Sequence, residues 1–145
     1  MIHHETAPDG AVVPKVGESG LFRMEMYRGE GVNAEAKQER GFASDPGDYG
    51  RGEYWTDSQA FASNYGTVRK TVIELRNALR LDPNEMVRLI RDEYGMTKAW
   101  LPQRERIAAA ERFTRDMLAK GYDGIAAYGY EQPDIWSVCV FDRSL

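Results

Sequence analysis

The apolar residues of this chain repeat with two different periods, and that change constrains the fold more than any other feature. From Leu21 to Arg28, apolar and polar residues alternate as in a β-strand with one buried face. From Pro102 to Lys120 the apolar residues follow helical spacing, and Gly121 is a typical helix end. Further strands are predicted over 52–56, 67–75, 125–128 and 135–141, and further helices over 57–65 and 83–94. Four or five short strands with three helices, not in strict alternation, predict an α+β fold.

Two of the predicted helices have recognisable starts. Asp57 or Ser58 is placed to cap the helix that ends before Gly66. Asp82 and Glu85 have the spacing of a capping box, with Pro83 at the first helical position.

Composition narrows the class of protein. Of the 145 residues, 42% are hydrophobic and 11% are aromatic, as in a folded globular chain. The net charge of −4 argues against a nucleic-acid partner, although it leaves room for a local basic pocket that holds one pyrophosphate.

The ends of the chain bear on its compartment. Residues 1–20 form a polar lead-in without the apolar core of a signal peptide, and residues 21–145 are expected to form a single domain. No apolar run is long enough to span a membrane, so no membrane partner is expected. Cys139 is the single cysteine and lies in an apolar run, which indicates a buried, unreactive thiol in a reducing, cytoplasmic setting. His3 and His4 lack further ligands, so no metal site is expected.

Arg28 stands where the apolar face of the first strand ends. A guanidinium aimed inward there needs an anionic or acceptor partner, whereas an arginine at the rim would extend to water. Residues 29–52, rich in glycine and charge, then form a loop that is either functional or disordered, with a short helix expected over 34–40. Because Gly50 and Gly52 precede a strand, they do not form a dinucleotide-binding fingerprint of the Rossmann kind.

Three segments carry a family resemblance. The first segment, Met26-Tyr27-Arg28-Gly29, ends the first strand. The second is the run Gly50 to Asp57 followed by Ser63-Asn64-Tyr65, in which Tyr54 and Tyr65 are eleven positions apart. The third consists of Gly121 to Ile125 and Val138 to Asp142. In this order they resemble the ADP-ribosyltransferase superfamily, over the chain from about Leu21 to its C-terminus. The resemblance implies a split β-core, in which two small sheets surround an NAD cleft and three helices complete the fold.

The resemblance also implies a set of site residues. Nicotinamide would lie between Tyr54 and Tyr65, and the residues that bind NAD would be Arg28, Gly29, Tyr54, Trp55, Thr56, Ser63 and Tyr65. The chain departs from the family pattern at two positions. Ala62 stands where a serine is usual, with Ser63 beside it, and Ser137 stands where the catalytic glutamate is usual.

The missing carboxylate leaves two acidic candidates near Ser137. Asp134 is closer to Ser137 in sequence. Glu131 matches the usual residue type and has the longer side chain, so it is slightly preferred. The alternative is that both are solvated acids of a loop, without a catalytic role. Catalysis would then depend on Glu131 or Asp134 together with Arg28, because the positive charge that develops on the ribose needs a fixed carboxylate.

The function implied is transfer of a single ADP-ribose from NAD to a macromolecular acceptor, expected to be a protein, with release of nicotinamide, as in bacterial or phage effectors. One alternative is a degenerate module that binds NAD or a protein without catalysis. Another is a toxin that hydrolyses NAD.

Overall fold

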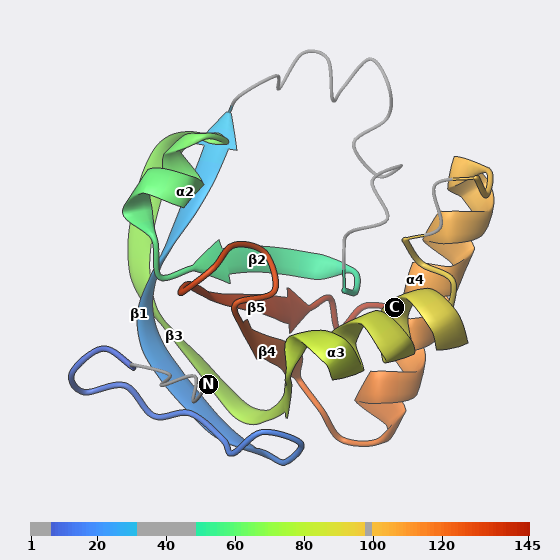
Figure 1. Cartoon of the computed structure of the whole chain (residues 1–145), viewed down its shortest axis with the longest axis horizontal. Helices are drawn as coiled ribbons and strands as arrows, with labels where there is room; N and C mark the ends of the chain where they lie inside the picture. Colours follow the sequence, from blue (N-terminus) through green and yellow to red (C-terminus); the bar gives the residue numbers. More distant parts are fainter. Residues whose placement is uncertain (1–6, 32–48, 98–99) are drawn as a thin grey trace.

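The computed structural model describes residues 7–31, 49–97 and 100–145, and these form a mixed α+β fold (Figure 1). The α+β prediction is therefore confirmed. The expected helix over 34–40, most of the glycine-rich loop, and His3 and His4 lie outside the described residues. The elements in chain order are β1 (Ser19–Gly31), β2 (Gly52–Thr56), α2 (Gln59–Ser63), β3 (Gly66–Leu81), α3 (Pro83–Met86), the π-helix η2 (Val87–Glu93), α4 (Gln103–Ala119), β4 (Gly124–Tyr128) and β5 (Trp136–Phe141).

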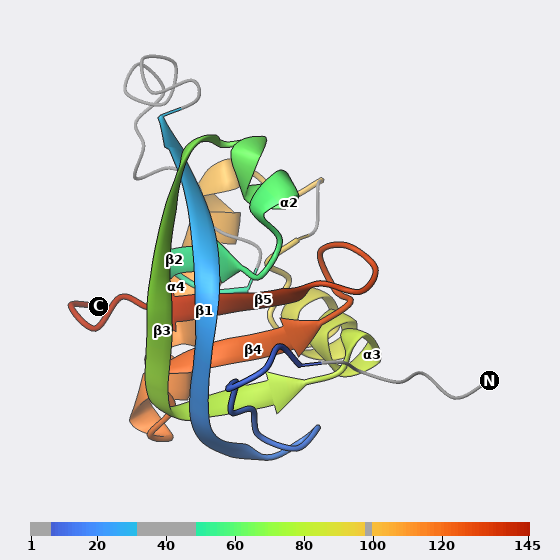
Figure 2. The same cartoon turned by 90° about the vertical axis from the view of Figure 1, so that its left-hand side faces the viewer.

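The five strands close into one barrel in the order β1-β2-β5-β4-β3. β1 and β3 pair antiparallel along almost their whole length and form a ribbon that runs across the other three strands (Figure 2). β2, β5 and β4 are antiparallel neighbours, and β4 is parallel to β3. β1 meets β2 at a single residue pair, Tyr27 opposite Thr56.

The closed barrel corrects the expectation of two separate small sheets. The strand predicted to end at Leu75 continues to Leu81, and its last part, Ala78 to Leu81, pairs with β4. β3 therefore hydrogen-bonds to β1 along one edge and to β4 along the other, which joins the two halves.

The inner core fills the barrel. It contains the buried face of β1, as the alternation predicted, together with two tryptophans from β2 and β5; its members are Phe22, Met24, Met26, Trp55, Leu75, Ala78, Ala126, Trp136 and Val138. Residues 11–18, assigned from sequence to the lead-in, also contact the barrel. Val12 bridges to Arg23, and the carbonyl of Pro14 accepts a hydrogen bond of 3.0 Å from the buried Arg80. Part of the lead-in is thus built into the fold.

The outer core lies between the barrel and the helices α3, η2 and α4 (Figure 1). Ile90, Phe113 and Met117 pack there against Cys139 and Phe141 of β5. Cys139 is fully buried, and desolvation raises the pKa of its thiol to about 12. The predicted burial of this thiol is confirmed.

Both predicted helix starts are present. Ser58 caps α2 by accepting a hydrogen bond from the Phe61 amide, and Asp82 caps α3 by accepting one from the Glu85 amide, with Pro83 at the first position. After one α-helical turn the chain widens into η2 rather than continuing as the predicted α-helix. No helix within the described residues is long and apolar enough to cross a membrane.

Candidate functional site

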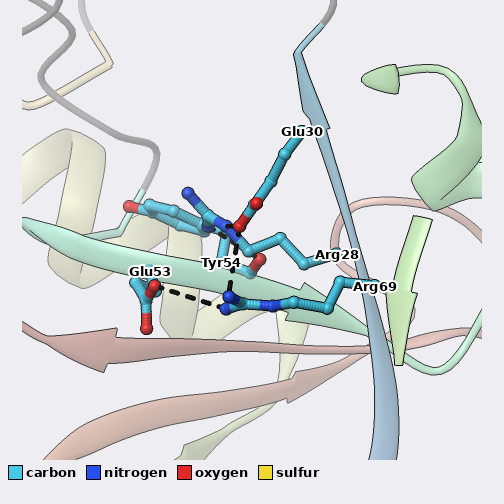
Figure 3. Close-up of polar contacts among 5 residues, drawn as sticks. All are labelled: Arg28, Glu30, Glu53, Tyr54 and Arg69. Atoms are coloured by element: carbon cyan, nitrogen blue, oxygen red, sulfur yellow. Dashed lines mark hydrogen bonds and ion pairs between the residues drawn. The ribbon is translucent and has the colours of Figure 1, made fainter. Parts of the chain in front are cut away.

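Arg28 leaves the inner face of β1 where the ribbon passes β2. Its side chain is 22% exposed, and its Nε forms an ion pair of 2.9 Å with Glu30 Oε1. Its Nη1 donates a hydrogen bond of 3.2 Å to the carbonyl oxygen of Tyr54 (Figure 3). Arg28 therefore has the anionic and acceptor partners that an inward guanidinium needs, and it is not a rim arginine extended to water.

Tyr54 is fixed by the segment that leads into β2. Its hydroxyl donates to the carbonyl of Gly50 and accepts a hydrogen bond of 3.0 Å from the Tyr49 amide. The ring of Tyr49, which is fully buried, meets the Tyr54 ring edge-on at 4.7 Å between centroids. Tyr49 thus contacts part of the surface that Tyr54 would offer to a ligand.

Gly29 joins the end of β1 to helix α2. A Cβ added at Gly29 would collide with the carbonyl oxygen of Ala62 and approach the Cβ of Tyr65. The ring of Tyr65 packs edge-on against Phe61 at 5.7 Å, and Tyr65 remains 50% exposed. Residues 28 and 29 therefore contact both segments that carry the predicted tyrosines, Arg28 at Tyr54 and Gly29 at Tyr65.

Three other predicted NAD-binding residues have structural roles. Trp55 is buried in the inner core, on the face of β2 opposite to Tyr54. The hydroxyl of the buried Thr56 accepts a hydrogen bond of 3.2 Å from the Ser58 amide at the start of α2. The Ser63 hydroxyl donates to the Ala60 carbonyl within the same helix at 2.6 Å.

The two candidate acids lie in the loop between β4 and β5. Asp134 is exposed, has a positive φ of 62°, and accepts a hydrogen bond of 3.3 Å from the Tyr128 hydroxyl. The pKa of Tyr128 is raised, first by desolvation and then by the charge of Asp134. Since Tyr128 packs on the inner core whereas Tyr54 packs on the outer core, Asp134 is held on the side away from Tyr54. Glu131 is partly buried.

Ser137 occupies the position where the resemblance expects a glutamate. It pairs with Thr56 across β2 and β5 and is 3% exposed. Because side chains alternate along β5, Ser137 shares a face with Cys139 and so with Tyr54. Its hydroxyl has no hydrogen-bond partner within the described part of the chain. Ser137 is thus buried on the same face of β5 as Cys139, and it carries no carboxylate.

A polar cluster around Arg28 was not anticipated from the sequence. Arg69 of β3 lies directly opposite Arg28, and its Nη2 is 3.7 Å from Glu30 and 3.8 Å from Glu53 (Figure 3). Its guanidinium also lies over the Trp55 ring, 5.0 Å from the centroid. The signal that would have found Arg69 is the register of the β1–β3 ribbon.

A pocket of about 410 Å³ lies elsewhere, between residues 8–11 and β1. Arg23, Glu25, Tyr27 and Asp57 are among its lining residues. Burial raises the pKa of Asp57, although its carboxylate accepts a hydrogen bond of 2.8 Å from the Trp136 amide, which acts in the opposite direction. Arg28, Tyr54 and Tyr65 do not line this pocket.

Comparisons of the chain with models of known protein families, with curated proteins and with solved structures found no match.

Proposed function

We propose that the chain binds NAD at the end of β1 and transfers a single ADP-ribose to a macromolecular acceptor, a protein, in the manner of bacterial or phage effectors. The observation that carries this proposal is the position of the Arg28-Gly29 pair. It contacts the backbone of Tyr54 on one side and the Tyr65 end of α2 on the other. These elements bring a planar guanidinium to the backbone of Tyr54 and bring the Tyr65 segment beside Gly29. A guanidinium can bind a phosphate and an aromatic ring can stack on a flat ligand, which supports the proposal.

The chemistry that these residues would support is cleavage of the bond between nicotinamide and ribose. Nicotinamide leaves with the bonding electron pair, which neutralises its pyridinium ring. The acceptor then bonds to the ribose carbon and loses a proton. Positive charge develops on the ribose as in glycoside hydrolysis, so a carboxylate nearby lowers the barrier. Glu131 is the better candidate, because Tyr128 holds Asp134 on the other side of β5.

A second function is favoured by one specific observation. Ser137 has the position of the expected glutamate but cannot carry a negative charge, and it is buried. A chain that binds NAD or a protein partner without breaking the nicotinamide bond would have this arrangement. The two functions differ in whether nicotinamide is released.

The test is release of nicotinamide from NAD, with and without cell extract, combined with detection of labelled ADP-ribose on macromolecules. For the transferase we expect release and labelling, and a loss of about 100-fold or more in rate for Glu131→Gln, the size typical of removing one charge-stabilising group. Arg28→Ala should also lose activity, whereas Asp134→Asn should retain it. Arg23→Ala is the matched control, because Arg23 lies on the same strand but faces outward.

Three outcomes would redirect the proposal. No release by the wild type would favour the binding module. Release that extract does not change, with no labelled macromolecule, would indicate an NAD-hydrolysing toxin. Loss of activity in Asp134→Asn but not in Glu131→Gln would exchange the roles of the two acids.

A further inference from the structure

We propose that Arg28 and Arg69 together form a binding site for a diphosphate group, and that Glu30 is an internal counter-ion which the ligand displaces. The proposal deepens the proposed function and rests on it for the identity of the natural ligand, the diphosphate of NAD. The arrangement of the two arginines does not depend on that identity.

The first observation is the register of the ribbon. Arg28 and Arg69 are direct cross-strand partners, so their side chains leave the same face of the ribbon. Further along this face the partners are apolar, with Phe22 opposite Leu75. Like charges placed directly opposite each other destabilise a strand pair unless an anion lies between them. The pair is therefore a local conflict that a bound anion relieves.

The second observation is the anion that now lies there. Glu30 Oε1 is 2.9 Å from Arg28 Nε and 3.7 Å from Arg69 Nη2, so one carboxylate oxygen interacts with both guanidinium groups (Figure 3). The Glu30 side chain is 45% exposed and that of Arg69 is 55% exposed. Ion pairs in contact with water are weak, so a stronger anion from solution can replace this carboxylate.

The third observation is that each arginine has contacts besides the one with Glu30, so displacing Glu30 would leave both in place. Arg28 is also held by the Tyr54 carbonyl, and Arg69 by the Trp55 ring and by Glu53. Each guanidinium keeps further N–H donors in a planar fork, which matches phosphate oxygens. A diphosphate offers oxygens on two phosphorus atoms, so one can engage each arginine.

The experiment is calorimetric titration of the full chain with inorganic pyrophosphate, inorganic phosphate and ADP-ribose at low ionic strength. We expect Arg69→Gln to weaken pyrophosphate binding about tenfold or more, the effect of losing one charge-assisted contact. Glu30→Gln should tighten it several-fold, which a variant that fails to fold could not do. Lys70→Gln is the matched control, because Lys70 is also 55% exposed but faces outward and pairs with Glu25.

The proposal is overturned if Arg69→Gln and Lys70→Gln have the same affinity for pyrophosphate, or if Glu30→Gln does not tighten binding. It is also overturned if inorganic phosphate binds as tightly as pyrophosphate, since the site would then hold a single phosphate. Tighter binding of ADP-ribose than of pyrophosphate, with the same response to Arg69→Gln, identifies a nucleotide as the ligand. Failure of nicotinamide release with intact pyrophosphate binding would contradict the transferase and leave this site standing.

Discussion

The two ends of the β1–β3 ribbon share one strand register, but the inner face is apolar at one end and charged at the other. At one end the inner face carries Phe22 and Met24, which pack inside the barrel. At the other end the same face carries Arg28, Glu30 and Arg69, which meet at the point where the ribbon passes β2. Burial fixes the first end, whereas partly exposed charges occupy the second. The comparison teaches that one pair of strands can carry both a buried, stabilising end and a charged end, which is the end that we propose binds the ligand.

The largest effect should come from the apolar end. Phe22→Ala removes a fully buried ring and should lower the free energy of unfolding by about 3–5 kcal/mol. Arg69→Gln, at the charged end, should change it by only about 0.5 kcal/mol or less, because exposed ion pairs contribute little. Urea unfolding of both variants measures the contrast. Comparable losses in the two variants would mean that the charged end is structural.

A smaller effect is expected where the charged end meets helix α2. In Gly29→Ala the new methyl group collides with the Ala62 carbonyl, so α2 must shift, at a cost of about 1–3 kcal/mol. Gly20→Ala is the control, because it lies on the same strand with open space around the added atom. Thermal or urea unfolding compares the two. Equal stability in both variants would show that α2 is not docked on Gly29.

A substitution at Ser137 is expected to change the free energy of unfolding by up to about 1 kcal/mol. Its buried hydroxyl has no partner in the described part of the chain, so Ser137→Ala should leave stability unchanged or raise it by up to about 1 kcal/mol. Thr114→Val should instead destabilise, because the Thr114 hydroxyl donates to the Ala110 carbonyl and accepts from the Arg51 amide. The urea midpoints of the two variants give the answer. A clear loss in Ser137→Ala would reveal a partner for its hydroxyl.

The smallest expected effect is a pH dependence of the folding stability. It arises from Asp57, which lies outside the charged end of the β1–β3 ribbon. Burial raises the pKa of its carboxyl above 3.8, so the folded state favours the protonated form. This contribution to stability is present below about pH 3.8 and is lost as the pH rises through the raised pKa. Asp57→Asn cannot titrate, so its stability relative to the wild type should increase across that window. Unfolding measured at several pH values tests this, and a constant difference would contradict it.

Residue type and spacing along the sequence predicted those helices and strands that depend on contacts between neighbouring residues. The strand over 52–56, the caps at Ser58 and Asp82 and the buried face of β1 all follow from residue type and spacing. The continuation of β3 to Leu81 could not be predicted in this way. Asn77 and Arg80 interrupt the apolar pattern, and each donates a hydrogen bond to a distant carbonyl, Asn77 to that of Gly121 and Arg80 to that of Pro14. Closure of the barrel depends on these long-range contacts.

The candidate site was predictable to a similar degree. Arg28 was identified because it ends an apolar face, and the structure gives it an acceptor and an anion. Arg69 was missed because only the register of the ribbon brings it opposite Arg28. Asp134 appeared close to Ser137 in sequence, but its backbone conformation and the Tyr128 hydroxyl hold it on the other side of β5. The proximity of Asp134 to Ser137 in sequence therefore did not predict on which side of β5 Asp134 lies.

The measurement that tests the account most directly is the affinity for NAD, determined by calorimetric titration of the wild type, Arg28→Gln, Tyr65→Ala and the outward-facing control Val72→Ala. Tyr65 and Val72 are both about half exposed, at 50% and 57%, so neither substitution should unfold the chain. We expect binding by the wild type and by Val72→Ala, a loss of about two- to tenfold for Tyr65→Ala from the missing aromatic contact, and a larger loss for Arg28→Gln. Wild-type affinity in both site variants, or no binding of NAD by the wild type, would contradict the account.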